Sequence, residues 1–441
     1  MKSPNILLAV SLVAFAGLPA RAQTVRLDAE TSARMAVRAS DLTVSAADRV
    51  EASTSAVKAA DAARLPVLSA NADLVQRSAI PEFGVPTDDP AEPVYILFPN
   101  IENTYSADLR LSQPIYTGGN IAANREAARL DQSAATWSQS LTALDLSYMA
   151  RTHYWSAVAA AASVDVAAAQ LTRTRRLLDD ARALRDAGMA VNADVFAAEA
   201  RTASADVDLI RAETEEEKAL AALRSLLGLE PSAAVILADT ETDKVPATPP
   251  ELEDLQTEAL DRRPELMVTD ARIQGLGARA KATNAARIPS VGLSAHWRYA
   301  RPNERYLPPV DEANDSWGIS LAASWRFFDG NRTKAQVATV NAEQSALRAD
   351  RGELERQVLL EVETARLELR AALEAVSAAD ASAAAAEAWE EASSERYSAG
   401  LAMLSELLDA QADLTAAEVS QVKTRVSAWM ADATLRRAVG R

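Results

Sequence analysis

The sequence predicts a mostly helical chain, built from two copies of one design, in which four long strands accompany several very long helices. Three observations predict this fold class. Short landmark sequences recur at fixed displacements, four segments alternate apolar and polar residues, and most other segments are rich in Ala, Leu, Glu and Arg. Alternation with period two indicates strands, whereas Ala-rich segments with little Gly or Pro favour helices.

Residues 1–22 have the pattern of a secretory signal peptide. Lys2 supplies a positive charge, the run from Ile6 to Leu18 is mostly apolar, and Ala20-Arg21-Ala22 resembles a cleavage site. The apolar run is shorter than the ~20 residues that a membrane anchor requires. We therefore expect an exported protein whose mature chain begins near Gln23.

The composition argues against several classes of protein. The chain has 46 basic and 62 acidic residues, and a net charge of −16 disfavours binding to nucleic acid or to anionic lipid. It has no cysteine, so we expect no disulfide, no thiolate metal site and no N-terminal lipid anchor. After the signal peptide, no run of about 18 apolar residues predicts a transmembrane helix. A part that enters a membrane would therefore have to be a barrel of strands.

A tandem duplication organises the rest of the chain. Ala63-Arg64-Leu65-Pro66 recurs as Ala286-Arg287-Ile288-Pro289. At a second, slightly smaller displacement, Ile115-Tyr116-Thr117-Gly118 returns as Phe327-Phe328-Asp329-Gly330, and Ala187-Gly188-Met189 returns as Ala399-Gly400-Leu401. We expect a first repeat over residues 23–228, a Pro-containing linker over 229–250 and a second repeat over 251–441.

Four strands are predicted, over residues 65–77 and 104–116 in the first repeat and 288–300 and 315–328 in the second. In the last of them, Trp317, Ile319 and Leu321 alternate with small or polar residues. Each strand exceeds the ~9–11 residues that cross a bilayer, but four strands cannot close a cylinder, so membrane insertion would require several copies. The alternative is a pair of soluble hairpins. The unequal Pro-rich segments 79–103 and 301–315 are expected to form their loops.

Very long helices are predicted between the strands. Residues 120–186 can form one uninterrupted helix of roughly 100 Å. Two sets of residues, at equivalent positions of the two repeats, keep the 4-3 spacing of a coiled-coil seam. They are Leu146, Ala150, His153, Ala157, Ala160, Val164, Ala167 and Leu171 in the first repeat, and Val358, Val362, Ala365, Leu369, Ala372, Val376, Ala379 and Ala383 in the second. Because alanine buries little area, these helices are expected to need lateral neighbours.

With these features in place, the chain resembles the TolC-like outer-membrane efflux proteins (outer membrane factors) along essentially its whole mature length. The residues that carry the resemblance are Gln113-Pro114-Ile115-Tyr116-Thr117-Gly118-Gly119, Arg263-Pro264-Glu265-Leu266 and the turns at Gly188 and Gly400. The resemblance implies a homotrimer with one 12-stranded barrel in the outer membrane of a Gram-negative bacterium. It also implies a helical tunnel through the periplasm that meets a membrane-fusion adaptor and an inner-membrane pump or exporter.

The resemblance also implies two kinds of site. Gly188 and Met189, with Gly400 and Leu401, correspond to the periplasmic tips where an adaptor docks. Acids lie six residues beyond each glycine, at Asp194 and Glu406, and Asp409 follows one helical turn later. By resemblance these acids line a narrow aperture, where three copies would crowd negative charge and select cations. The alternative is that they are solvated acids on a helix face. The basic residue that often clasps this aperture has no equivalent at Ala402.

No catalytic, metal-binding or cofactor-binding residue is predicted. Gly275-Leu276-Gly277 fits a loose dinucleotide pattern, but no strand precedes it. His153 and His296 are far apart in the sequence, so they predict no metal cluster. We expect a passive channel subunit of a tripartite efflux or type I secretion system, not an enzyme. The alternatives are a soluble periplasmic coiled-coil scaffold or adaptor, which would not need the two hairpins, and an exported hydrolase.

Overall fold

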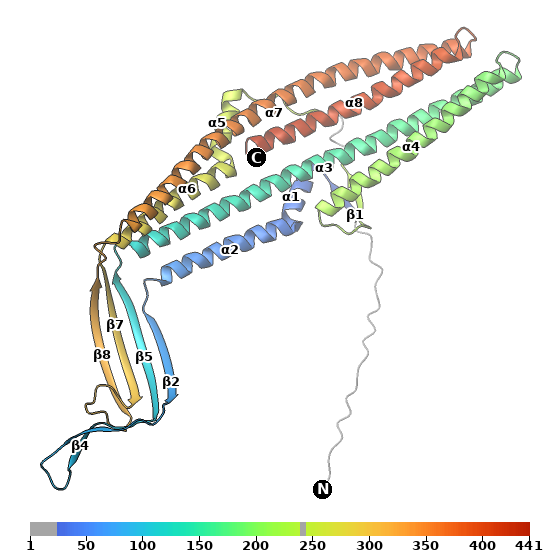
Figure 1. The fold of residues 1–441 in the computed structure, drawn as a ribbon. Coiled ribbons are helices and arrows are strands. Elements are labelled where there is room, and N and C mark those ends of the chain that lie inside the picture. The colour runs from blue at the N-terminus through green and yellow to red at the C-terminus, as the bar shows by residue number, and fades with distance from the viewer. Residues whose placement is uncertain (1–23, 239–243) are drawn as a thin grey trace, which may run out of the picture.

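The computed structural model describes residues 24–238 and 244–441, so the predicted signal peptide lies outside the described residues. Four long strands form a sheet at one end of the molecule, and long helices run from it to the opposite end (Figure 1). No helix in these described ranges is both long and apolar enough to cross a membrane.

The element boundaries repeat at the two displacements that the landmarks have. At the larger displacement, the first repeat has α1 (Ala29–Ala39), α2 (Asp41–Ala62) and β2 (Val67–Gln76). Their equivalents in the second repeat are α5 (Leu252–Arg262), α6 (Pro264–Asn284) and β7 (Ser290–Arg301). At the smaller displacement, the first repeat has β5 (Asn103–Tyr116), α3 (Asn120–Asp186) and α4 (Asn192–Leu226). Their equivalents are β8 (Asn314–Ser324), α7 (Arg332–Ser398) and α8 (Leu404–Ala438). The structure is therefore duplicated element by element, and the single helix predicted over 120–186 is confirmed.

The four strands form one antiparallel sheet in the order β2-β5-β7-β8. Its register brings apolar residues of all four strands to a common face, with pairs such as Leu68 and Leu111, Leu109 and Trp297, and Trp297 and Trp317. The other face is polar, and there Arg298 pairs with Asp108 at 2.6 Å. Both edges, β2 and β8, lack a partner strand among the described residues. The strand predicted over 315–328 ends earlier, at Ser324.

Two short sheets lie outside the predicted elements. The β1 strand (Thr24–Leu27) pairs in parallel with β6 (Ala234–Leu237), which lies inside the segment predicted to be a linker. Within the Pro-rich loop, β3 (Phe83–Pro86) pairs with β4 (Val94–Phe98), and this hairpin projects beyond the far end of the large sheet (Figure 1). The linker and the loop therefore both contain regular structure.

The long helices form two hairpins that lie side by side. The α3 helix packs against α4 and α8, and α8 packs against α7, so α4 and α7 are the outer helices of a layer of four. Closer to the sheet, α2 and α6 flank α3. The short helices α1 and α5 contact α3 and α7 at mid-length. This arrangement leaves one side of α4 and one side of α7 without a neighbour in the described part of the protomer.

The predicted seams are largely buried. Seven of the eight second-repeat positions are buried, and only Ala372 is half-buried. In the first repeat His153, Ala160 and Val164 are half-buried, and beside His153 the ring of Tyr154 and the indole of Trp155 are buried in the core. Trp155 stacks on Trp429 of α8 with ring centroids 4.9 Å apart. Large aromatic side chains therefore supply the buried area that the alanines lack at this level.

Candidate functional site: the helical tips

Each long hairpin turns at a glycine in the left-handed conformation. Gly188 has φ of 77° and Gly400 has φ of 72°, and both turns close with the same pair of backbone hydrogen bonds. The N–H of Met189 donates to Leu184 O at 2.8 Å, and the N–H of Leu401 donates to Arg396 O at 2.8 Å. This is the Schellman termination, for which glycine is the least strained residue. The two tips are thus equivalent in structure.

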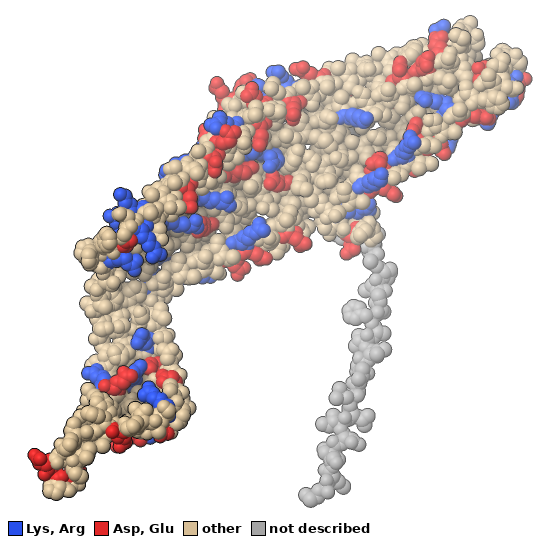
Figure 2. Space-filling model, viewed as in Figure 1, with Lys and Arg blue, Asp and Glu red and all other residues tan. Residues whose placement is uncertain are grey.

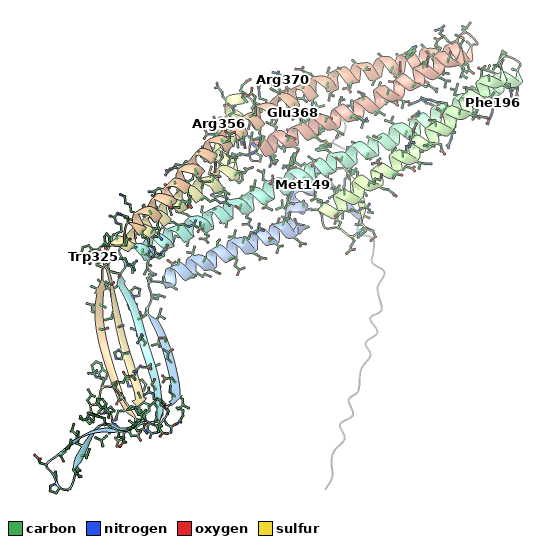
Figure 3. All side chains as sticks on the ribbon, viewed as in Figure 1. Met149, Phe196, Trp325, Arg356, Glu368 and Arg370 are labelled. Carbon is green, nitrogen blue, oxygen red and sulfur yellow. The ribbon has the colours of Figure 1, made fainter. Side chains whose placement is uncertain are left out.

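The two tips lie side by side and enclose a groove of about 460 Å³. The first hairpin contributes Leu184, Met189 and Asp194, and the second contributes residues 397–400 and 402–405. Met189 and Leu401 are 72% and 73% exposed. Phe196, on the first turns of α4, is also exposed near this end (Figure 3). The tips therefore present apolar side chains to solvent around a concave surface.

Tyr397 lies in the wall of this groove. Its side chain is buried against Leu177, Leu404 and Leu407, and its hydroxyl has no hydrogen-bond partner among the described residues. Burial raises the pKa of the Tyr397 phenol, and the nearby carboxylates of Asp194 and Asp180 raise that pKa further. The phenol is therefore held in its neutral form.

The two acids that follow the glycines occupy the third position of the returning helices. The Asp194 carboxylate accepts a hydrogen bond from the N–H of Val191 at 3.3 Å, which is half of a capping box. Glu406 lies at the same place in α8 and forms a 2.6 Å ion pair with Arg396 of α7. A negative side chain in the first turn of a helix is stabilised by the helix dipole. Both acids therefore have a local structural role.

Asp409 differs from these acids. It is exposed and has no ion pair or side-chain hydrogen bond among the described residues. Arg396 and Tyr397 were missed by the sequence analysis, which looked for a basic residue after the second glycine and not before it. The signal that could have identified Arg396 is its position in the last turn of α7, since a cation is favoured at a helix C-terminus. Tyr397 has no comparable signal in the sequence.

Neither histidine belongs to a metal site in the described part of the chain, which contains no group of three or more His, Cys, Asp or Glu side chains able to hold a metal ion. His296 lies on the polar face of the sheet, opposite Gly318. A Cβ at Gly318 would come within 2.7 Å of the His296 ring, so the glycine makes room for it.

Comparison with known proteins decides the family. The profile of the outer membrane efflux protein family matches residues 33–229 and 255–441, which is one match to each repeat. The chain belongs to this family. The two matches cover both long hairpins and all four strands of the large sheet. The sheet and the tips of this efflux protein therefore both lie within the part of the chain that the family profile matches.

Individual relatives agree with the assignment. Protein CyaE of Bordetella pertussis is 28% identical to the efflux protein over 308 residues, which are 64% of this chain and 60% of that protein. The chain thus spans about 60% of the length of that relative. Among solved structures, the outer membrane protein VceC of Vibrio cholerae has a TM-score of 0.77 at 20% identity, over 93% of this chain and 96% of that one. The Neisseria gonorrhoeae MtrE outer membrane channel has a TM-score of 0.75 at 18% identity, over 93% and 88%.

Proposed function

We propose that this efflux protein is the outer-membrane channel subunit of a tripartite efflux or type I secretion system. It conducts substrates passively, and it performs no chemistry. The observation that carries the proposal is the four-stranded sheet, which has one continuous apolar face and two open edges among the described residues. The alternative of a soluble coiled-coil scaffold accounts for the helices but leaves this sheet unexplained.

The sheet supports assembly with other copies. Open strand edges are not tolerated in lipid, because unpaired backbone groups there cost several kcal/mol each. Four strands are too few to close a cylinder, whereas three copies supply 12. We propose that β8 of one copy pairs with β2 of the next and that the apolar face contacts lipid. The polar face, with Arg298 and Asp108, then lines the pore.

The outer helices support the same assembly. The side of α4 that α3 leaves free carries exposed residues in 4-3 spacing, namely Phe196, Ala200, Ala203, Val207 and Ile210. The free side of α7 carries Ala378, Ala381, Ala385, Ala388 and Ala392, which are also exposed. The five α4 residues follow Gly188 at the same five sequence distances at which the five α7 residues precede Gly400. Because the tips lie at one level (Figure 1), large residues of α4 would meet alanines of α7 from the next copy.

A cysteine pair tests this contact. The chain has no native cysteine, so Ala203→Cys with Ala385→Cys introduces only the two thiols of interest. Within a protomer, α3 and α8 lie between these helices. A disulfide needs Cα atoms within about 7 Å, so it can form only between copies. We expect oxidation to give a covalent trimer in the outer-membrane fraction. The control pairs Ala203→Cys with Ala384→Cys, one residue off the stripe.

One result would contradict the channel proposal, and another would contradict the α4–α7 contact. One is a monomer released with the soluble periplasm, and the other is a membrane-bound protein in which both cysteine pairs cross-link equally poorly. The first would favour the scaffold function. The second would refute the α4–α7 contact.

We propose that the tips are the docking surface for a periplasmic adaptor, through which an inner-membrane pump or exporter supplies the energy. The exposed side chains of Met189 and Leu401 support this, since exposed apolar groups beside a groove are typical of protein interfaces. Met189→Asp with Leu401→Asp is expected to abolish export while the trimer remains intact. Phe83→Asp, at the opposite end, is the control. Export that survives the tip variant would refute the docking role.

We also propose that Glu406 and Asp409 of three copies, with Asp194 nearby, form the periplasmic aperture. Arg396 would replace the missing basic residue at Ala402, because its ion pair with Glu406 ties α7 to the start of α8. In planar bilayers, Asp409→Asn is expected to reduce cation selectivity, and Arg396→Gln to increase conductance. Unchanged selectivity in an Asp409→Asn, Glu406→Gln double variant would place the aperture elsewhere.

A further inference from the structure

The junction between the sheet and the helices is basic in a strongly acidic protein. Four chain segments meet there, 61–66, 117–129, 279–289 and 325–334, because each adjoins an end of β2, β5, β7 or β8. Together they contain nine Lys or Arg and three Asp or Glu, a net charge of +6 against −16 for the whole chain. We call these segments the junction band. Figure 2 shows Lys and Arg gathered at this level.

Most cations of the junction band are free to bind an anion. Arg125 and Arg129 share Asp61, and Arg279 pairs with Asp131. The remaining six are exposed and have no ion pair among the described residues; they are Arg64, Lys281, Arg287, Arg326, Arg332 and Lys334. Arginines without an ion pair also occur elsewhere among the described residues, such as Arg176 and Arg348, so it is the net charge of +6 in four adjoining segments that distinguishes the junction.

Exposed apolar residues accompany these cations. Tyr116 ends β5, and Trp325, Phe327 and Phe328 follow β8 with 60%, 82% and 79% of their surfaces exposed. The Trp325 indole N–H donates to the backbone oxygen of Arg287 at 3.1 Å, which holds the indole against the chain segment before β7. Figure 3 shows Trp325 at the junction of the sheet and the helices. Aromatic rings with neighbouring Lys and Arg are the pattern of a surface at the boundary between lipid tails and headgroups.

The start of α7 shows that the positive charge is not there to stabilise the helix. Its first turn contains Arg332 and Lys334 and no acid, although a cation at a helix N-terminus is disfavoured by the helix dipole. The acid at this end is Asp329, which precedes the helix and whose carboxylate accepts a hydrogen bond from the N–H of Thr333 at 2.9 Å. The first turn of α3 also lacks an acid. At the tips, by contrast, α4 and α8 each begin with an acid. The first turn of α7 therefore carries cations that a helix N-terminus does not favour, whereas the first turns at the tips carry acids.

From these observations we infer that the junction band binds the headgroups of anionic phospholipids in the membrane leaflet that faces the helical domain. The inference rests on the proposed channel function, which places the sheet in lipid. The aromatic rings lie among the upper acyl chains, and the free Lys and Arg side chains contact the phosphates. The lipid ring fixes the depth of the sheet in the membrane. The net charge of −16 predicted repulsion of anionic lipid, and the junction band is the local exception.

Native mass spectrometry of the detergent-solubilised protein tests the inference. The protein is equilibrated with equal amounts of phosphatidylglycerol and phosphatidylcholine that have identical acyl chains. We expect phosphatidylglycerol to be retained at least tenfold over phosphatidylcholine, and the preference to weaken in high salt. The quadruple variant K281Q/R287Q/R326Q/K334Q should lose most of this preference. The double variant R287K/R326K, in which all four positions carry lysine, should keep the wild-type preference.

The control variant R175Q/R176Q/R211Q/K423Q removes the same charge from exposed positions on the helices and should keep the wild-type preference. Inorganic phosphate as competitor distinguishes the sources of the anion, since a site for free phosphate would lose phosphatidylglycerol at millimolar phosphate. Wild-type trimer without lipid preference, or equal losses in both quadruple variants, would overturn the inference. The same spectra report oligomeric state, so a monomer that retains phosphatidylglycerol would refute the proposed channel and not the lipid site.

Discussion

Replacing Arg263 is expected to destabilise the contact between the start of α6 and the C-terminal end of α8. Arg263 links α5 to α6 and is 2% exposed. Its guanidinium donates to the backbone oxygens of Arg437 and Ala438 at 3.3 and 3.2 Å, which are the last carbonyls of α8, and to the Glu361 carboxylate of α7 at 2.6 Å. One side chain therefore connects three helices.

The cost of Arg263→Met follows from these contacts. Breaking a buried ion pair costs ~3–5 kcal/mol, but Glu361 is 49% exposed and water can solvate its carboxylate after the change. The two carbonyls of α8 lose a charged donor, which costs ~1.5–3 kcal/mol. We expect a total of about 3 kcal/mol. With an unfolding entropy of ~2.1 cal/mol/K per residue, a chain of 441 residues should melt about 3 °C lower.

Arg262→Met is the matched control. The Arg262 side chain is 60% exposed and, within residues 24–238 and 244–441, pairs only with Glu258, one helical turn away at 2.8 Å. Its loss should therefore cost under ~0.5 kcal/mol. Melting of both variants is followed by circular dichroism at 222 nm, in the detergent in which the wild-type protein is purified. If the Arg263 variant melts within about 1 °C of wild type, or no lower than the Arg262 variant, the structural role assigned to Arg263 is wrong.

Three further predictions concern single side chains, and the same melting assay checks them. Gly118→Ala should destabilise by at least ~2 kcal/mol more than Gly188→Ala, because both glycines have positive φ but only at Gly118 would the new Cβ lie 2.7 Å from Ile288; equal shifts would refute the clash. Trp155→Ala should cost ~3–5 kcal/mol, since it removes a buried ring. Tyr397→Phe should be neutral or stabilising at pH 7, since it removes a buried hydroxyl without a partner among the described residues. Because burial raises the pKa of Tyr397, the wild type should lose stability as the pH rises above 10, and the Phe variant should lack this loss.

Sequence patterns predicted the large elements because these are defined locally. A helix such as α3 is specified by 67 residues of favourable propensity between two glycine-containing turns, at Gly118-Gly119 and at Gly188. The two faces of each strand follow from alternation. The observed register, which brings Trp297 opposite Trp317, agrees with the faces that alternation predicts. Duplication then supplies a second, independent example of each element.

The elements that escaped prediction depend on contacts distant in sequence. Strand β1 is short and pairs with β6, which follows only after the whole first repeat, so neither run is distinctive by itself. The β3–β4 hairpin lies in the Pro-rich segment 79–103, which was predicted to be a loop, and the prolines around it obscure the strand pattern. The β8 strand ends at Ser324 although its alternation continues, and the indole of Trp325 is instead held by Arg287. Alternation cannot reveal where a neighbouring strand stops pairing.

Comparison of the two repeats also distinguishes two kinds of acid at the tips. Asp194 and Glu406 are equivalent positions, and each is explained by its place in the first turn of a helix, whether or not an aperture exists. A feature present in both repeats for a local reason is weak support for a function that only one repeat performs. Asp409 has no such explanation, since its counterpart in the first repeat is Ala197 and since it has no partner among the described residues. If the acids of the second hairpin form an aperture, Asp409 is therefore the residue whose charge is available to the passing ion, and Glu406 is the one that Arg396 holds in place.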